Sequence, residues 1–410
     1  MVYFYSQNFN TMRNLYFFNS DNEMAIANGR ISYTPPVKIM RMMNDLAFLP
    51  AFLANKGDFV LLNRPLSDCF KKEYDIFPGL VESGITREEA GRISFNELRP
   101  WGWSPRVHYL LKELKSRCKK EFTGGVMGEW SPGREEWYSR RKVIDYFQIL
   151  RCYMDFPAEL VPVVCHSVEE IKKLSERENI VVKSPWSSSG RGVFMLEKGK
   201  ITSKTIEWLN GIFHRQRYVM VEKMWDKIWD FAMEFEIDDK GNSSFLGLSD
   251  FYVGKEGEYK GNYVGKQEKI EEKITCYVGK EDFLTLRNTV SRVIEKLYGG
   301  NYIGCLGVDM MIYRDEWGNY KIHPCVEINL RYTMGIVALS LSEHYLAEES
   351  EGVFQVQCFS RQGEAYRYYL ETKKNIPLVV EGGKIVSGCL FLTPVLEDTI
   401  FIANLIVDGR

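Results

Sequence analysis

One segment of the chain constrains the fold more than any other, because it combines two long apolar runs with acidic side chains at strand spacing. Residues 307–330 contain GVDMMIY and IHPCVEINL, separated by the turn DEWG, and this pattern predicts a β-hairpin. A strand places Glu327 and Asn329 on one face, and Asp309 could lie opposite them on the neighbouring strand. Carboxylate and amide oxygens suit Mg²⁺, which takes its remaining ligands from water and phosphate. The hairpin therefore predicts a magnesium site, with a solvated sheet face as the alternative.

A second informative segment, VVKSPWSSSGRGVFML at residues 181–196, predicts a strand that carries Lys183, a loop of small residues, and another strand. Small residues let backbone N–H groups approach an anion, hydroxyl groups add donors, and the lysine adds positive charge. The loop joins two strands, whereas a Walker A loop and a dinucleotide fingerprint both lead into a helix. A flexible Ser/Gly-rich hairpin is the alternative. The residues that we expect to cradle phosphate are Lys183, Ser187, Ser188, Ser189, Gly190, Arg191 and Gly192.

The composition indicates a globular protein with more than one core. The chain has 410 residues, of which 45% are apolar and 14% aromatic, so we expect two or three compact units. The net charge of -2 is evenly spread, which predicts neither a nucleic-acid nor a membrane partner. The nine cysteines include no C-x-x-C pair, so neither a disulfide framework nor a zinc site is expected. We recognise no secretory signal and no apolar run of ~18 residues, and we expect a cytoplasmic protein.

The order of the expected elements divides the chain into four parts. Short strands at residues 15–19 and 59–63 alternate with helical stretches, which predicts a Rossmann-like parallel sheet. Longer strands follow residue 218, and the tail predicts helices at about 339–349 and 363–373 and a hairpin with a Glu-Gly-Gly turn. The expected domains are an N-terminal α/β domain (1–135), a smaller unit (136–217), a larger unit with the metal site (218–345) and a C-terminal extension packed on the larger unit (346–410).

This order of elements resembles that of the ATP-grasp superfamily, whose enzymes hold ATP between two α+β subdomains. The resemblance covers roughly residues 137–335. Its motifs are a lysine near a helix start, a strand lysine with a Gly-rich loop, a hinge glutamate, and then an aspartate and Glu-x-Asn. The resemblance implies a parallel-sheet domain followed by a two-subdomain ATP-grasp fold. It also implies that Lys142 and Lys183 contact the phosphates, with Arg141 competing for the position of Lys142.

The resemblance places the adenine and ribose contacts around residues 222–230. Glu222 resembles the hinge between the subdomains, and the backbone around Lys223 and Met224 would hydrogen-bond the base. Asp230 stands where the family has an acid on the ribose hydroxyls, and Asp226 is the alternative.

The hairpin residues then match the metal ligands of the family. Asp309, Glu327 and Asn329 would hold Mg²⁺ against phosphate oxygens during phosphoryl transfer. Many members carry an arginine two residues before the aspartate, where this chain has Gly307. Arg331 lies on the same strand face as Asn329 and is the natural substitute for steadying a phosphoryl or acyl-phosphate oxyanion. We therefore assign catalytic roles to Arg331 and Lys183.

The implied activity is that of a carboxylate–amine ligase that uses ATP and Mg²⁺, with Mn²⁺ as a substitute metal. Such an enzyme phosphorylates a small-molecule or peptide carboxylate and couples the acyl phosphate to an amine or thiol. Two alternatives stay open, which are an ATP-grasp kinase that phosphorylates a hydroxyl and a non-catalytic nucleotide-binding module. A homodimer is compatible with the sequence.

Three segments are candidates for the acceptor side of the site, although each also fits ordinary turn chemistry. They are a polar cluster at residues 19–30, an aromatic and basic loop at 99–106, and the Gly-, Tyr- and Lys-rich segment 250–265, which could close as a lid. The residues that we expect to be structural rather than catalytic are Cys305, Cys325, His166 and His323.

Overall fold

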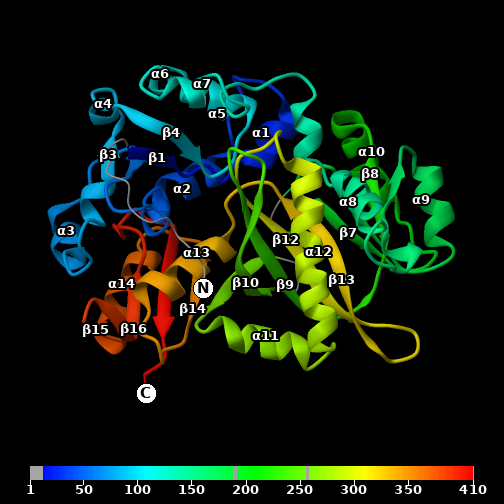
Figure 1. Cartoon of the computed structure of the whole chain (residues 1–410). Coiled ribbons are helices and arrows are strands. Elements are labelled where there is room, and N and C mark those ends of the chain that lie inside the picture. The colour runs from blue at the N-terminus through cyan, green and yellow to red at the C-terminus, as the bar shows by residue number, and fades with distance from the viewer. Residues whose placement is uncertain (1–12, 188–189, 191, 255–257, 410) are drawn as a thin grey trace.

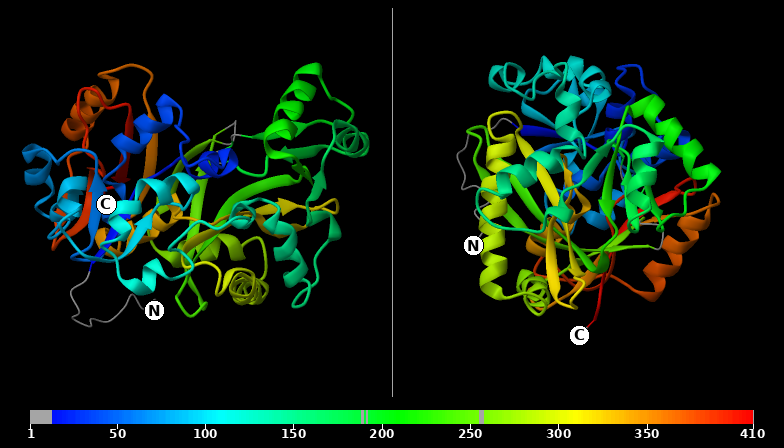
Figure 2. Two further views of the ribbon diagram at one scale, coloured as in Figure 1. Left: turned by 90° about the horizontal axis from the view of Figure 1, so that it is seen from above. Right: turned by 90° about the vertical axis from the view of Figure 1, so that its right-hand side faces the viewer.

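The computed structural model describes residues 13–187, 190, 192–254 and 258–409 (Figure 1). Ser188, Ser189 and Arg191 of the expected phosphate loop lie outside the described residues. The strands form two four-stranded sheets and one nine-stranded sheet. Figure 2 shows the N-terminal sheet, in blue, and the small sheet, in green, toward opposite ends of the molecule, with the long strands of the nine-stranded sheet between them.

The N-terminal sheet has the strand order β3-β2-β1-β4, and all its neighbouring strands are parallel, so the expected parallel sheet is confirmed. Strand β2 (Phe59–Leu62) is buried along its whole length, as strands covered on both faces are. The other strands are β1 (Arg13–Phe17), β3 (Gly84–Thr86) and β4 (Phe95–Pro100). The helices are α1 (Asn22–Asn28), α2 (Val37–Asp45), η1 (Leu49–Phe52), α3 (Asp68–Tyr74), η2 (Val81–Ser83), α4 (Arg87–Ala90), α5 (Pro105–Leu110), α6 (Lys112–Lys115) and α7 (Lys120–Thr123).

The small sheet is antiparallel and has the order β5-β8-β6-β7. Its strands are β5 (Val163–Cys165), β6 (Ile180–Lys183), β7 (Val193–Leu196) and β8 (Val219–Lys223). The helices of this part are η3 (Arg134–Tyr138), α8 (Lys142–Leu150), η4 (Ala158–Leu160), α9 (Val168–Ser175) and α10 (Ser203–Gln216). Arg140 and Arg141 precede α8, and the Arg140 N–H donates to the carbonyl of Pro185 before the helix starts.

The nine-stranded sheet has the order β13-β12-β9-β10-β11-β14-β17-β16-β15. The expected hairpin is present as β12 and β13, and its register sets Asp309 opposite Glu327 on one side and opposite Ala232 of β9 on the other. The strands are β9 (Asp226–Ile237), β10 (Ser243–Val253), β11 (Tyr259–Val264), β12 (Gly304–Arg314), β13 (Tyr320–Asn329), β14 (Gly352–Cys358), β15 (Val379–Glu381), β16 (Lys384–Phe391) and β17 (Phe401–Val407). The helices are α11 (Gln267–Thr275), α12 (Lys280–Tyr298), α13 (Met334–Ser340), the π turn η5 (Leu341–Tyr345) and α14 (Glu364–Asn375).

Two expectations for this part are wrong. The helix expected at about residues 339–349 starts and ends earlier, because Thr333 caps α13 so that the helix begins at Met334, and the chain leaves the helix after Tyr345. The segment at residues 250–265 is not a loop along its described residues. These residues lie mostly in β10 and β11, where Asn262 is buried and donates to Ser249 Oγ at 2.7 Å.

Apolar packing joins the N-terminal sheet to the central strands and their helices in one core. The largest core cluster combines β9, β12, α8 and α12 with residues of the N-terminal sheet such as Leu15, Phe59 and Leu98. Within the described residues, no helix combines the length and the apolar character that crossing a bilayer requires.

Candidate nucleotide and metal site

Lys183 lies where the small sheet meets the hairpin β12–β13. Its Nζ atom is 2.6 Å from Glu222 Oε2 on the neighbouring strand β8 and donates to the carbonyl of Val326 on β13 at 3.3 Å. Both charged side chains are nearly buried, so each depends on the other for its charge balance. The strand lysine and the hinge glutamate of the sequence analysis therefore meet, and they do so beside the hairpin.

The three expected metal ligands also meet on the hairpin. Asp309 pairs in register with Glu327, and Asn329 Nδ2 donates to Asp309 Oδ2 at 3.0 Å. Burial raises the pKa of Asp309, and the negative charge of Glu327 raises it further. A cation is what would relieve this repulsion between two close carboxylates.

The donor set fits Mg²⁺ better than a softer metal. The described residues contain no group of three His, Cys, Asp or Glu side chains that could hold a metal by themselves. Two carboxylates and one amide oxygen leave positions for water and phosphate, as Mg²⁺ prefers.

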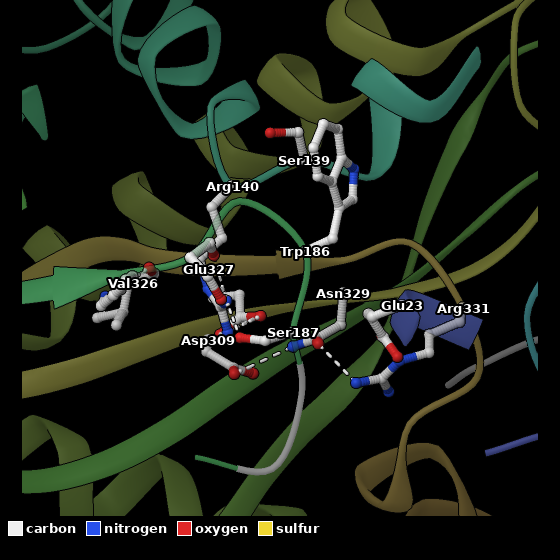
Figure 3. A network of polar contacts seen from close by, with 12 residues as sticks. Glu23, Ser139, Arg140, Trp186, Ser187, Asp309, Val326, Glu327, Asn329 and Arg331 are labelled. Carbon is white, nitrogen blue, oxygen red and sulfur yellow. Dashed lines mark hydrogen bonds and ion pairs between the residues drawn. The ribbon is translucent and has the colours of Figure 1, made fainter. Parts of the chain in front are cut away.

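Arg331 connects the hairpin to the N-terminal domain. Its Nη2 atom donates to Asn329 Oδ1 at 2.9 Å, and its Nε atom forms an ion pair with Glu23 of α1 (Figure 3). Burial alone would lower the pKa of Arg331, but Glu23 and the acids of the hairpin raise it above its usual value. The position that we assigned to oxyanion binding thus carries a permanent positive charge next to Asn329.

Arg140 is the residue of the site that the sequence analysis missed. Its Nη2 atom donates to both oxygens of Glu327, and its Nη1 atom donates to the Ser184 carbonyl at 2.8 Å and to Ser187 Oγ at 2.5 Å (Figure 3). The side chain is only 5% exposed. One guanidinium therefore ties the start of the phosphate loop to a metal-ligand candidate. The run Arg140-Arg141-Lys142 was a signal, but nothing in the sequence shows which of the three side chains turns inward.

The other predicted contacts have local partners. Lys142 Nζ is 2.6 Å from Asp145 on its own helix, Lys223 Nζ is 2.7 Å from Glu316, and Asp230 Oδ2 is 2.6 Å from Lys227. The roles assigned to these side chains stay predictions. The remaining partners are Met224, whose N–H donates to the Asn179 carbonyl at 2.9 Å, and Asp226, which pairs with Arg314 at 2.7 Å.

The described part of the phosphate loop needs its glycines. Gly190 and Gly192 have φ angles of 72° and 73°, in the left-handed region that favours glycine. A Cβ atom on Gly192 would lie 2.1 Å from Ser184 Oγ, so a larger residue would displace this serine. The Gly192 carbonyl accepts from the Ser184 N–H at 2.7 Å, which closes the base of the loop.

Glu234 fills the space above Gly307, the position where many ATP-grasp enzymes carry an arginine. The two residues are paired in register, and a Cβ atom on Gly307 would lie 2.6 Å from Glu234 Oε2. Burial raises the pKa of Glu234 to about 8, and the charge of Asp309 contributes. Glu234 is therefore a neutral carboxylic acid at neutral pH, close to both Asp309 and Arg331.

Comparisons with known proteins bear on the fold. No family model matches the sequence, and no curated protein is similar to it. The biotin carboxylase domain of 2-oxoglutarate carboxylase from Hydrogenobacter thermophilus, solved with MgADP, ADP and bicarbonate, is 13% identical, with a TM-score of 0.50 over 97% of this chain and 86% of that chain. N5-carboxyaminoimidazole synthetase from Staphylococcus aureus, solved with ADP, is 10% identical, with a TM-score of 0.49 over 98% and 96%. L-amino acid ligase from Bacillus licheniformis is 13% identical, with a TM-score of 0.47 over 98% and 94%.

The first of these structures supports the assignment of the fold, together with the arrangement of the three sheets. The chain has the ATP-grasp fold with an N-terminal parallel-sheet domain, which is the fold that its sequence resembles.

Proposed function

We propose that the protein is an ATP- and Mg²⁺-dependent ligase that phosphorylates a small-molecule or peptide carboxylate and couples it to an amine. The observation that carries the proposal is the convergence of three distant segments at one place. Lys183 of the small sheet, the carboxylates of the hairpin and Glu23 of the N-terminal domain are linked by direct polar contacts through Val326, Asn329 and Arg331.

Each of these residues has a definite task in the proposed reaction. Asp309, Glu327 and Asn329 would hold Mg²⁺, which supplies positive charge to the phosphate oxygens when it is bound. Lys183 and the phosphate loop orient the triphosphate, and Arg140 fixes the loop against Glu327. Arg331 holds the oxygens of the reacting carboxylate, because a partly buried guanidinium next to Asn329 offers a fixed charge-assisted donor.

The reaction has two steps. An oxygen of the substrate carboxylate attacks the γ-phosphorus, the bond to the leaving ADP oxygen breaks, and an acyl phosphate forms. The amine then attacks the acyl carbon, phosphate leaves with the bonding electrons, and the amine loses a proton. No covalent enzyme intermediate is required, which agrees with the burial of Cys305 and Cys325 among apolar residues.

The solved structure with similar fold supports the nucleotide and metal parts of this proposal, because it contains MgADP. That structure is also a dimer. A homodimer is accordingly part of the proposal, and light scattering on the purified protein would test it.

The function is tested by ADP release in a matrix of carboxylates and amines, with Mg²⁺ present. We expect release that requires both a carboxylate and an amine. Lys183→Ala and Glu327→Ala should abolish turnover and weaken Mg·ATP binding in calorimetry, while Glu207→Gln on the exposed face of α10 should change neither. ADP release that requires only a hydroxyl compound would show that the protein is a kinase and not a ligase. Unchanged Mg·ATP binding in both Lys183→Ala and Glu327→Ala would overturn the nucleotide site itself.

A further inference from the structure

A cavity of about 310 Å³ lies between the N-terminal domain and the ends of two central strands. One wall is β4 with the residues that follow it, and the opposite wall is the end of β9 and the start of β12. This volume is at the lower end of the range that small-molecule sites occupy. The wall includes the loop at residues 99–103, part of the segment that the sequence singled out for the acceptor.

The cavity carries an excess of negative charge. Arg99 lies between two acids, with its Nε atom 2.5 Å from Glu97 Oε1 and its Nη1 atom 3.8 Å from Glu236 Oε1. Two acids therefore surround the arginine of the cavity wall, and their charge exceeds that of the guanidinium. The charged side chains that line the cavity are four acids and two bases, namely Glu97, Glu121, Glu236, Asp239, Arg99 and Lys119.

Aromatic side chains form the apolar part of the wall. Trp101, Tyr302 and Tyr332 all line the cavity and are buried. A carboxylate excess next to aromatic faces favours an organic cation, because ring faces attract ammonium groups and carboxylates pair with them. The cavity is thus suited to an amine rather than to an acid.

The cavity lies on the same strand face as the metal-ligand candidates. Glu236 and Glu234 point to the same side of β9 as Ala232, which pairs with Asp309. Four strand positions separate Glu236 from Ala232, which corresponds to about 13 Å. Glu234 lies between them, is 1% exposed, and its Oε2 atom has no hydrogen-bond partner among the described residues. An unpaired carboxyl oxygen thus lies on this strand face, between Glu236 at the cavity wall and Ala232 beside Asp309.

We propose that this cavity binds the amine substrate and that the substrate is an aliphatic amine with at least two amino groups. One ammonium group pairs with Glu236 at the aromatic wall. The chain of the amine extends along β9 from Glu236 toward Glu234, two strand positions or about 7 Å away, and the second amino group attacks the acyl carbon near Arg331. This inference rests on the proposed function for the identity of the electrophile, but the binding of the amine does not depend on it.

The experiment is calorimetric titration of the full chain with 1,5-diaminopentane and with glutarate, the dicarboxylate of equal carbon number. We expect the diamine to bind and glutarate not to bind. Glu236→Gln should weaken diamine binding at least tenfold, because it removes the charge and keeps the shape. Glu207→Gln, the same change on the exposed face of α10 and outside the cavity lining, should leave the affinity unchanged. Glu97→Gln serves as a second variant in case Glu236→Gln does not fold.

The outcomes separate this inference from the proposed function. Lys183→Ala should lose Mg·ATP binding and keep diamine binding. If the wild type binds Mg·ATP but not the diamine, or binds glutarate equally well, the cavity assignment is wrong and the nucleotide site stands. Diamine binding by a wild type that does not bind Mg·ATP would support the cavity assignment and contradict the proposed ligase function. Diamine binding that is unchanged in Glu236→Gln and Glu97→Gln would also overturn the assignment.

Discussion

The Nη2 atom of Arg140 donates to both carboxylate oxygens of Glu327, at 2.8 and 2.9 Å. The Nη1 atom of the same guanidinium donates to the Ser184 carbonyl and to Ser187 Oγ. Residues from two other segments are thereby held by one side chain, which is almost completely buried. The position of the phosphate loop relative to the metal-ligand candidate Glu327 depends on this contact.

Arg140→Ala should lower the free energy of unfolding by about 3 kcal/mol or more, because it leaves the partly buried charge of Glu327 without its partner. The free energy of unfolding of Arg140→Lys should lie between those of the wild type and Arg140→Ala. An ammonium group keeps the charge but cannot donate to Glu327 and Ser184 with the same fork geometry. Urea unfolding measures both. Arg141→Ala is the matched control, because Arg141 is exposed, and it should change stability by no more than about 0.5 kcal/mol. Equal effects of the two alanine variants would contradict the role of Arg140.

Arg140 also shows where prediction from the sequence ends. The β-hairpin with Asp309, Glu327 and Asn329 could be predicted, because strand periodicity fixes which side chains share a face. The fold could also be predicted, because the motifs occur along the chain in the order that ATP-grasp enzymes have. The choice among Arg140, Arg141 and Lys142 could not be predicted, because it depends on where α8 begins, and that point is set by the contact of Arg140 with Pro185 across a long sequence separation.

The segment 250–265 was misjudged for a related reason. Its Gly, Tyr and Lys residues are typical of a mobile loop, yet β11 pairs with β14 more than eighty residues later in the chain. A strand whose partner is so distant leaves little local signal. Buried hydrogen bonds of Asn262 to Ser249 and Asp250 then fix it in place.

Lys183→Met and Lys142→Met should differ in their effect on Mg·ATP binding. Lys183 is buried between Glu222 and the Val326 carbonyl, so its charge faces the proposed phosphate site from a fixed position. Lys142 pairs with Asp145 on its own helix. We expect at least a tenfold loss of affinity for Lys183→Met and a change of less than threefold for Lys142→Met, measured by calorimetry. A large loss of Mg·ATP affinity in Lys142→Met would instead support the phosphate contact of Lys142 that the sequence resemblance implies.

The affinity for Mg²⁺ should rise between about pH 6 and pH 8. Burial and the neighbouring charge of Glu327 raise the pKa of Asp309, so a bound metal must displace a proton from this pair at lower pH. Titration calorimetry in two buffers of different ionisation enthalpy would show the proton release directly. Asp309→Asn should remove the pH dependence together with most of the affinity. A pH-independent affinity in the wild type would contradict the assignment of Asp309 as a ligand.

The stability of the protein should fall as the pH rises through the titration range of Glu234. The folded state keeps the proton up to about pH 8, whereas the unfolded carboxyl loses it near its ordinary value of 4.5. Between these values the folded state binds more protons, so each pH unit costs up to about 1.4 kcal/mol. Glu234→Gln is neutral at every pH. Its free energy of unfolding, relative to that of the wild type, should therefore rise by a few kcal/mol between pH 5 and pH 8. Urea unfolding of both proteins in Mg²⁺-free buffer at pH 5 and pH 8 tests this prediction. An equal change in the free energy of unfolding of the two proteins between these pH values would contradict it.

Gly307 and Glu234 should be coupled in a double-mutant cycle. A Cβ atom on Gly307 would lie 2.6 Å from Glu234 Oε2 and 2.9 Å from Thr333 Cγ2, so Gly307→Ala should cost about 1–3 kcal/mol through overpacking. In the background of Glu234→Ala the carboxyl is gone and only the methyl contact with Thr333 remains, so the same substitution should cost clearly less.

A glycine substitution elsewhere provides the control for that cycle. Gly211→Ala on α10 meets only the flexible end of Arg215, at 3.4 Å, and should be neutral or stabilising. Equal costs of Gly307→Ala in the two backgrounds would show that Glu234 does not occupy the space. If the coupling is found, it explains why this chain has no arginine two residues before Asp309. The buried acid on β9 fills the volume that an arginine side chain would need, and in our proposal Arg331, just after the end of β13, supplies the cation of the site instead.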